Sequence, residues 1–177
     1  MTTITEFNEV QRLHRWWVWL AVLALNGLIL YAIVQQVILG NPFGNKPAPD
    51  MVLLLIEAFL LLLLLFVFSI RLKTSFNEKG IFYRYYPFQF KTTCIAWQEL
   101  SDAYIREYNS FYEFGGWGIR LGTQKAGRAI NTSASSRRGL QLQFKDGKLL
   151  QIGTSDPDSI QEILDQLMAE GIIQKRI

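Results

Sequence analysis

The sequence predicts an α+β protein in which a hairpin of two transmembrane helices is followed by a strand-rich domain and a C-terminal helix. Three observations support this. Two long segments carry almost no charge, a segment rich in proline and glycine separates them, and short alternating strands follow. Residues 16–70 include three charged residues, whereas residues 71–177 carry 15 Lys/Arg and 11 Asp/Glu. The two parts are therefore expected in different solvents.

The first apolar segment, residues 16–39, has 24 residues and no charge. As a helix it would be about 36 Å long, enough to cross a hydrocarbon core of about 30 Å. The second segment, residues 51–70, has 20 residues and one charge, and the three prolines of the connection 40–50 end both helices. Since a second span follows at once, we expect a retained hairpin and no cleaved signal peptide.

Basic residues predict the orientation of the hairpin. Arg12 and Arg15 precede the first span, Arg71 and Lys73 follow the second, and the connection holds only Lys46. We therefore expect a multi-pass protein of the cell inner membrane with both termini cytoplasmic.

This orientation divides the chain into a cytoplasmic N-terminal tail (1–15), a transmembrane hairpin (16–70) with the loop 40–50 outside, and a cytoplasmic domain (71–177). Aromatic side chains that favour the membrane interface stand at the start of the first span. The expected interface anchors are Trp16, Trp17 and Trp19.

Polar side chains inside the two spans need partners in lipid. We expect Glu57 to be protonated or hydrogen-bonded to Gln35 or Gln36, which face it at a similar depth. Asn26, near the middle of the first span, is expected at a helix–helix or subunit contact. A proton relay needs several ionisable groups, so use of Glu57 by a transporter or enzyme complex is the weaker alternative.

The rest of the chain reads as short strands. Residues 73–88 predict a hairpin that turns at residues 77–80. In residues 139–154, a three-residue turn at 145–147 would set Leu142 opposite Leu150, which leaves one face apolar and the other polar. Other expected strands lie in residues 91–100, 102–108, 117–122 and 127–131.

The end of the chain predicts an amphipathic helix. Asp156 can cap it, Pro157 suits its first turn, and Gly171 can end it. One apolar stripe would cover the sheet, formed by Ile160, Ile163, Leu164, Leu167 and Met168.

The stretch FGGWGIRLG, residues 114–122, contains a G-x-G-x-x-x-G pattern close to a dinucleotide fingerprint. A fingerprint needs a helix after its glycines, because the helix amides bind pyrophosphate. No amphipathic pattern follows here. We therefore expect a turn that enters a strand, and no nucleotide site.

A basic segment without acidic residues runs from Phe114 to Phe144. It is a candidate contact for anionic lipid head groups or a protein partner, whereas nucleic acid is not expected. Its candidate residues are Arg120, Lys125, Arg128, Arg137 and Arg138. With one cysteine, Cys94, expected in the core, and one histidine, His14, we expect no cofactor, metal site or catalytic triad.

The layout resembles small bacterial two-span membrane proteins with a C-terminal pleckstrin-homology-like (PH-like) domain and no characterised function. The resemblance rests on LKTSFNEKGIFYRYYPF, on YNSFYEFGGWGIR and on GLQLQFKDGKLLQIGTSDPDSIQEIL. It implies a bent antiparallel sheet of about seven strands capped by the C-terminal helix, and no catalytic residues.

From the residues and this resemblance together we expect a non-enzymatic membrane protein that presents its domain for protein or peptide interaction. Homo-oligomers through the spans are a further option. Sensing of anionic lipid or a phosphorylated ligand through residues 120–138 is the alternative function.

Overall fold

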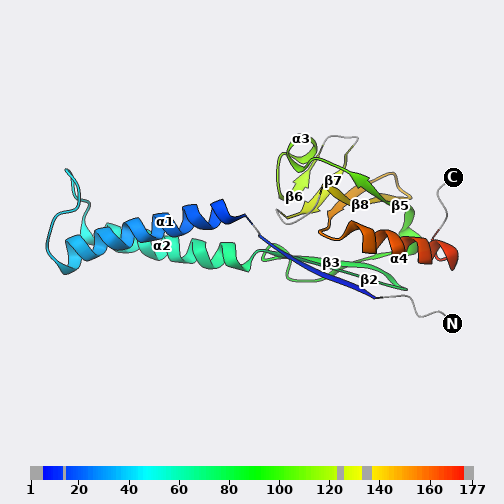
Figure 1. Ribbon diagram of the computed structural model, residues 1–177, viewed down its shortest axis with the longest axis horizontal. Helices are drawn as coiled ribbons and strands as arrows, with labels where there is room; N and C mark the ends of the chain where they lie inside the picture. Colours follow the sequence, from blue (N-terminus) through cyan, green and yellow to red (C-terminus); the bar gives the residue numbers. More distant parts are fainter. Residues whose placement is uncertain (1–5, 14, 123–125, 133–136, 174–177) are drawn as a thin grey trace. The chain divides into compact units, whose positions relative to one another are not determined.

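The computed structural model describes residues 6–13, 15–122, 126–132 and 137–173, and Figure 1 shows its helices and strands. The chain divides into two compact units. One unit is residues 15–69, and the other joins residues 1–14 to residues 70–177. Each unit is described by itself below.

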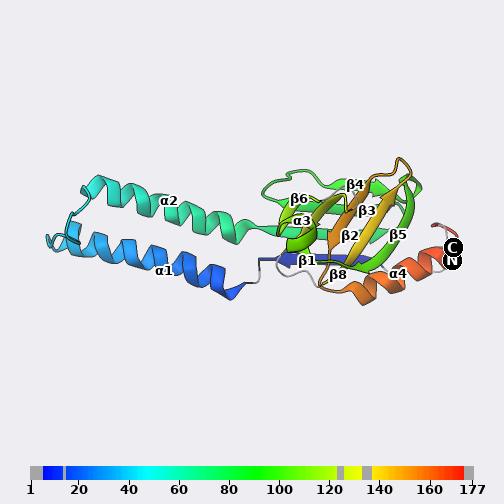
Figure 2. The same cartoon turned by 90° about the horizontal axis from the view of Figure 1, so that it is seen from above.

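The helical unit is a hairpin. Helix α1 (Trp16–Ile33) continues as a π-helical turn (Val34–Ile38), and α2 (Asp50–Ser69) runs beside it (Figure 2). Both helices are long and apolar enough to cross a membrane, with mean hydropathies of 2.2 and 3.1. The predicted helix bounds are confirmed to within about one residue, because the prolines of the connection end both patterns.

The first sheet of the other unit is antiparallel, in the order β1-β2-β3-β4. Residues 1–15 were predicted as a tail, but Phe7–Arg12 form β1, which pairs with β2 along its whole length. The prediction failed because the partner of β1 lies about 60 to 70 residues further along the chain. The other strands are β2 (Arg71–Asn77), β3 (Gly80–Tyr86) and β4 (Thr93–Ala96).

The second sheet has the order β5-β8-β9-β7-β6. Its strands are β5 (Leu100–Glu107), β6 (Gly118–Leu121), β7 (Arg128–Asn131), β8 (Arg138–Phe144) and β9 (Leu149–Gly153). A single bent antiparallel sheet was predicted, whereas the described strands form two sheets, and β9 runs parallel to β7. The reason is that β9 folds back from β8 and inserts between β8 and β7.

The predicted hairpin at residues 139–154 is confirmed in its register. Leu142 pairs with Leu150, and Gln141 pairs with Gln151. Gly147 takes a left-handed φ of 83° in the three-residue turn, a conformation that suits glycine. The polar face of this hairpin is covered in the structure, since both glutamines are buried.

Helix α4 (Pro157–Ala169) packs against β5, β8 and β1 (Figure 1). Asp156 caps it as predicted: its carboxylate accepts from the Ser159 amide at 3.2 Å and hydroxyl at 2.7 Å, and these bonds lower the pKa of Asp156. Leu164 and Leu167 join the core shared by both sheets, where each buried leucine contributes roughly 1.5–3 kcal/mol.

Candidate functional site

Strand β1 joins the two sheets through buried hydrogen bonds. The Gln11 amide donates to the carbonyl of Gly153 at 2.7 Å, and the Thr132 hydroxyl donates to Gln11 Oε1 at 2.8 Å. Only 2% of the Gln11 surface is exposed. These bonds connect β1 to β9 and to the end of β7, which brings Leu13 close to the second sheet.

A cavity of about 410 Å³ opens at this place, and we call it the junction pocket. Leu13 directly follows β1 and Ile70 directly precedes β2, so the pocket lies where the chain leaves this unit for the helices and returns from them. Its lining residues are Leu13, Ile70, Tyr85, Phe88, Trp117, Gly118, Ile119, Arg120 and Thr132.

The described lining of the junction pocket is mostly apolar, with Arg120 as its one cation. Tyr85 is 5% exposed, and this burial raises the pKa of its phenol, while the nearby charge of Arg120 lowers it. Arg120 is exposed, and its Nε donates to the carbonyl of Trp117 at 3.0 Å. The pocket therefore suits an apolar group attached to an anion.

The glycine stretch forms one wall of the pocket. The predicted turn into a strand is confirmed, because Gly115 and Gly116 have φ of 71° and 129° and β6 begins at Gly118. A short helix, α3 (Ser110–Phe114), precedes the turn and was not predicted. The side chain of Asn109 caps α3 by accepting hydrogen bonds from two backbone amides. Periodicity could not predict this helix, because five residues are too few to show a helical repeat of apolar side chains.

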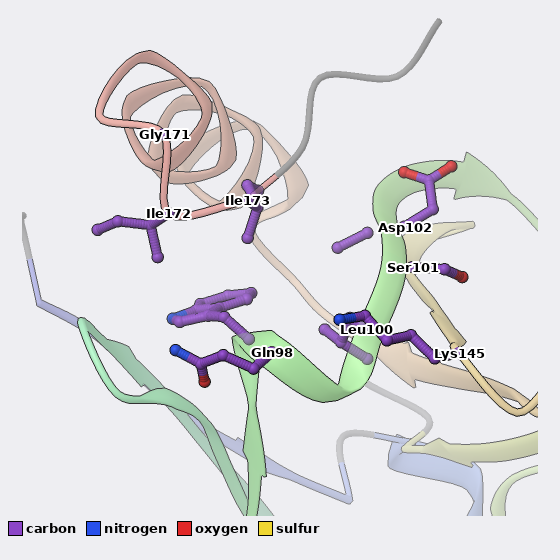
Figure 3. Close-up of a pocket in the computed structure, with 10 residues that line it drawn as sticks. Gln98, Leu100, Ser101, Asp102, Lys145, Gly171, Ile172 and Ile173 are labelled. Carbon is purple, nitrogen blue, oxygen red and sulfur yellow. The ribbon is translucent and has the colours of Figure 1, made fainter.

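A second, more polar cavity of about 230 Å³ lies between β5 and the residues that follow α4. Figure 3 shows Ile172 and Ile173 on one side of it and Leu100, Ser101 and Asp102 on the other. Its described lining includes two opposite charges, Asp102 and Lys145, whereas the described lining of the junction pocket has Arg120 alone.

The predicted basic residues do not form one surface. Arg120 pairs with Ala129 and Arg128 pairs with Leu121, so the two arginines lie on opposite faces of the β6–β7 pair. Arg138 forms a salt bridge with Asp158 at 2.7 Å. Arg137 is exposed, and Lys125 lies outside the described residues.

The predicted polar contacts of the hairpin are also rearranged. The Gln36 amide donates to the carbonyl of Ala48 at 2.7 Å and to the carboxylate of Asp50 at 2.6 Å, so its predicted bond to Glu57 is wrong. The reason is that the connection folds back onto the π-helical turn that carries Gln36. Glu57 is buried, and its Oε2 has no hydrogen-bond partner among the described residues. A protonated Glu57 stays a prediction.

Other predicted residues lie as follows. Asn26 is buried in α1, and its amide donates to the carbonyl of Val22 at 2.7 Å. Trp16 and Trp17 are exposed, whereas Trp19 packs edge-on against Phe68, with ring centres 6.1 Å apart.

The chain has one cysteine and one histidine, and the structure describes only the cysteine. Cys94 is exposed on β4, so its predicted core position is wrong. His14 lies outside the described residues. Within the part of the chain that the structure describes, no three His, Cys, Asp or Glu residues come together as metal ligands.

Comparison with protein families identifies a family for most of the chain. The sequence model of a family of unknown function, DUF6141, matches residues 2–169. No curated protein matches the chain.

Proposed function

Because the chain belongs to this family of unknown function, DUF6141, we propose its function from its own structure. We propose that α1 and α2 span the cell inner membrane and that they anchor a cytoplasmic, PH-like domain that binds a protein or peptide without catalysing a reaction.

The observation that carries the membrane proposal is the exposure of apolar side chains on both helices. Leu62 and Phe68 of α2 are 66% and 68% exposed, and Leu20 of α1 is 59% exposed. A core helix of a water-soluble protein would bury these side chains, since each contributes roughly 1.5–3 kcal/mol when removed from water. A lipid bilayer would remove all of these exposed apolar side chains from water.

The lone cysteine provides a direct test of this topology. Cys94 is exposed in the strand-rich unit, so a membrane-impermeant maleimide should label it in inverted vesicles and not in intact cells. In a Cys94→Ser background, Asn45→Cys in the connection should show the reverse pattern. Labelling of Cys94 in intact cells would reject the orientation, and release of the chain by alkaline carbonate would reject the spans.

A binding role for the domain is supported by the junction pocket. Its described lining is mostly apolar with one cation, Arg120, a composition that suits binding of a ligand. The strand β6 borders the pocket and is the last of the described strands in the second sheet, so an added strand could pair with its outer edge. An apolar side chain with a nearby carboxylate fits this place, with the carboxylate at Arg120.

Site-specific cross-linking tests this binding role. A photoreactive phenylalanine analogue at position 88, in the pocket, should give a discrete adduct in native membranes. The same analogue at position 112, which is 90% exposed and outside the pocket, is the control. Arg120→Glu should reduce the position-88 adduct at least about tenfold, since it replaces attraction with repulsion. An adduct that is unchanged in this variant would refute the assigned pocket.

A further inference from the structure

Four cations from three different strands lie together on the outer face of the first sheet. Side chains alternate along each strand, and the inward positions of β2 and β3 are the buried ones. The outward positions pair across strands: Arg12 with Arg71, Arg71 with Tyr86, and Lys73 with Arg84. We call the four cations Arg12, Arg71, Lys73 and Arg84 the basic face.

The basic face has no carboxylate of its own. Strands β1 to β4 contain a single acidic residue, Glu9. Its carboxylate is turned the other way, where it accepts from the Thr154 hydroxyl at 2.8 Å and the Ser155 amide at 2.7 Å. The positive charge of this face is therefore not neutralised within its own sheet.

Aromatic rings accompany the cations. The guanidinium carbons of Arg71 and Arg84 lie 5.1 Å and 5.8 Å from the centre of the Tyr86 ring. Phe90 packs edge-on against Tyr86 and is 72% exposed. Exposed aromatic rings beside cations are typical of surfaces that enter the head-group region of a bilayer.

The chain itself limits how far this face can lie from the bilayer. Arg12 stands four residues before Trp16, and Arg71 stands two residues after Ser69. Four extended residues span about 14 Å at most, which is comparable to a Debye length of about 8–10 Å. If the helices span the membrane, as proposed above, the nearest cations lie within the field of an anionic leaflet.

We propose that the basic face docks on anionic phospholipid head groups of the membrane in which the hairpin is anchored. This inference rests on the proposed spans and concerns a surface other than the junction pocket and the 120–138 segment. Docking would hold the domain in one orientation on the leaflet. The fraction of docked protein would depend on the content of anionic lipid.

The experiment uses the full-length protein in nanodiscs and a donor dye on Cys94. This cysteine pairs with Phe82 and is exposed on the same side as the basic face. An acceptor dye on lipid head groups reports, through energy transfer, how closely Cys94 approaches the membrane surface. Energy transfer should be higher in discs that contain phosphatidylglycerol than in pure phosphatidylcholine, and salt near 1 M should abolish the difference because the Debye length falls to about 3 Å.

Variants distinguish docking through the basic face from a general effect of positive charge on the protein. Lys73→Gln with Arg84→Gln should weaken docking by about fivefold for each cation removed. Lys73→Gln alone is the safer variant, because this side chain is exposed. The matched control is Arg128→Gln with Lys145→Gln, two exposed cations, one on β7 and one in the turn between β8 and β9, which should leave transfer unchanged.

Two results would overturn the proposal: equal transfer in both lipids, or an equal loss in the control variant. Carbonate extraction of the same protein distinguishes the two levels of inference. A chain that stays in the membrane but shows no lipid dependence refutes docking alone, whereas a chain that is extracted refutes the spans.

Discussion

A Gln11→Ala variant is expected to lose roughly 2–4 kcal/mol of the free energy of unfolding of the strand-rich unit. The substitution removes a side chain that is 2% exposed and leaves the carbonyl of Gly153 and the hydroxyl of Thr132 without this partner. Both groups lie where the two sheets meet, so water cannot replace the amide without opening the junction.

Denaturant unfolding of the protein in detergent, followed by tryptophan fluorescence, measures this loss, since Trp97 is 2% exposed in the same core. Asn8→Ala is the matched control, because Asn8 is exposed on the same strand and should change stability by less than about 0.5 kcal/mol. If both variants unfold at the same denaturant concentration as the parent, β1 is not the joint between the sheets. The junction pocket would then lose its structural basis too.

A Gly80→Ala variant is expected to lose roughly 3 kcal/mol or more, because two penalties act at one position. Gly80 has a φ of 153°, which residues with a β-carbon rarely adopt. A β-carbon there would also lie 2.1 Å from the carbonyl oxygen of Ile95, a backbone atom of the paired strand β4. The β3–β4 pairing would have to shift, and with it the strand that carries Cys94.

Gly147→Ala separates the two penalties in the same unfolding experiment. Gly147 also has a positive φ, 83°, but no atom lies within 4 Å of a β-carbon built on it. This control should therefore lose only the conformational penalty, about 1–2 kcal/mol. Equal losses in the two variants would contradict the close contact between β3 and β4.

Local patterns predicted a large part of this fold. The helix bounds, the register of Leu142 with Leu150 and the capping of α4 by Asp156 follow from spacings of a few residues. The Gly115–Gly116 turn was also predicted correctly, because a glycine pair specifies backbone conformation without reference to distant residues.

Local sequence patterns predicted the candidate binding surfaces less well than they predicted the fold. The basic segment was read as one candidate surface, but adjacent positions of a strand point to opposite faces, and Arg120 and Arg128 are separated in this way. Arg12 on β1 and Arg71 and Lys73 on β2 were used only to orient the helices, and Arg84 on β3 was not singled out. Their alternation could have indicated a shared face, but only once the pairing of Lys73 with Arg84 was assumed.

The sequence by itself determined that two apolar helices form a hairpin, that strands follow, and that an amphipathic helix covers them, since each depends on hydrophobic period and on turn residues close together in the chain. Tertiary structure alone decided that β1 completes the first sheet, that β9 inserts beside β7, and that Gln36 bonds to the connection. These contacts join segments whose pairing depends on loop closure and on the packing of the whole core, and neither quantity is encoded in any one stretch of residues.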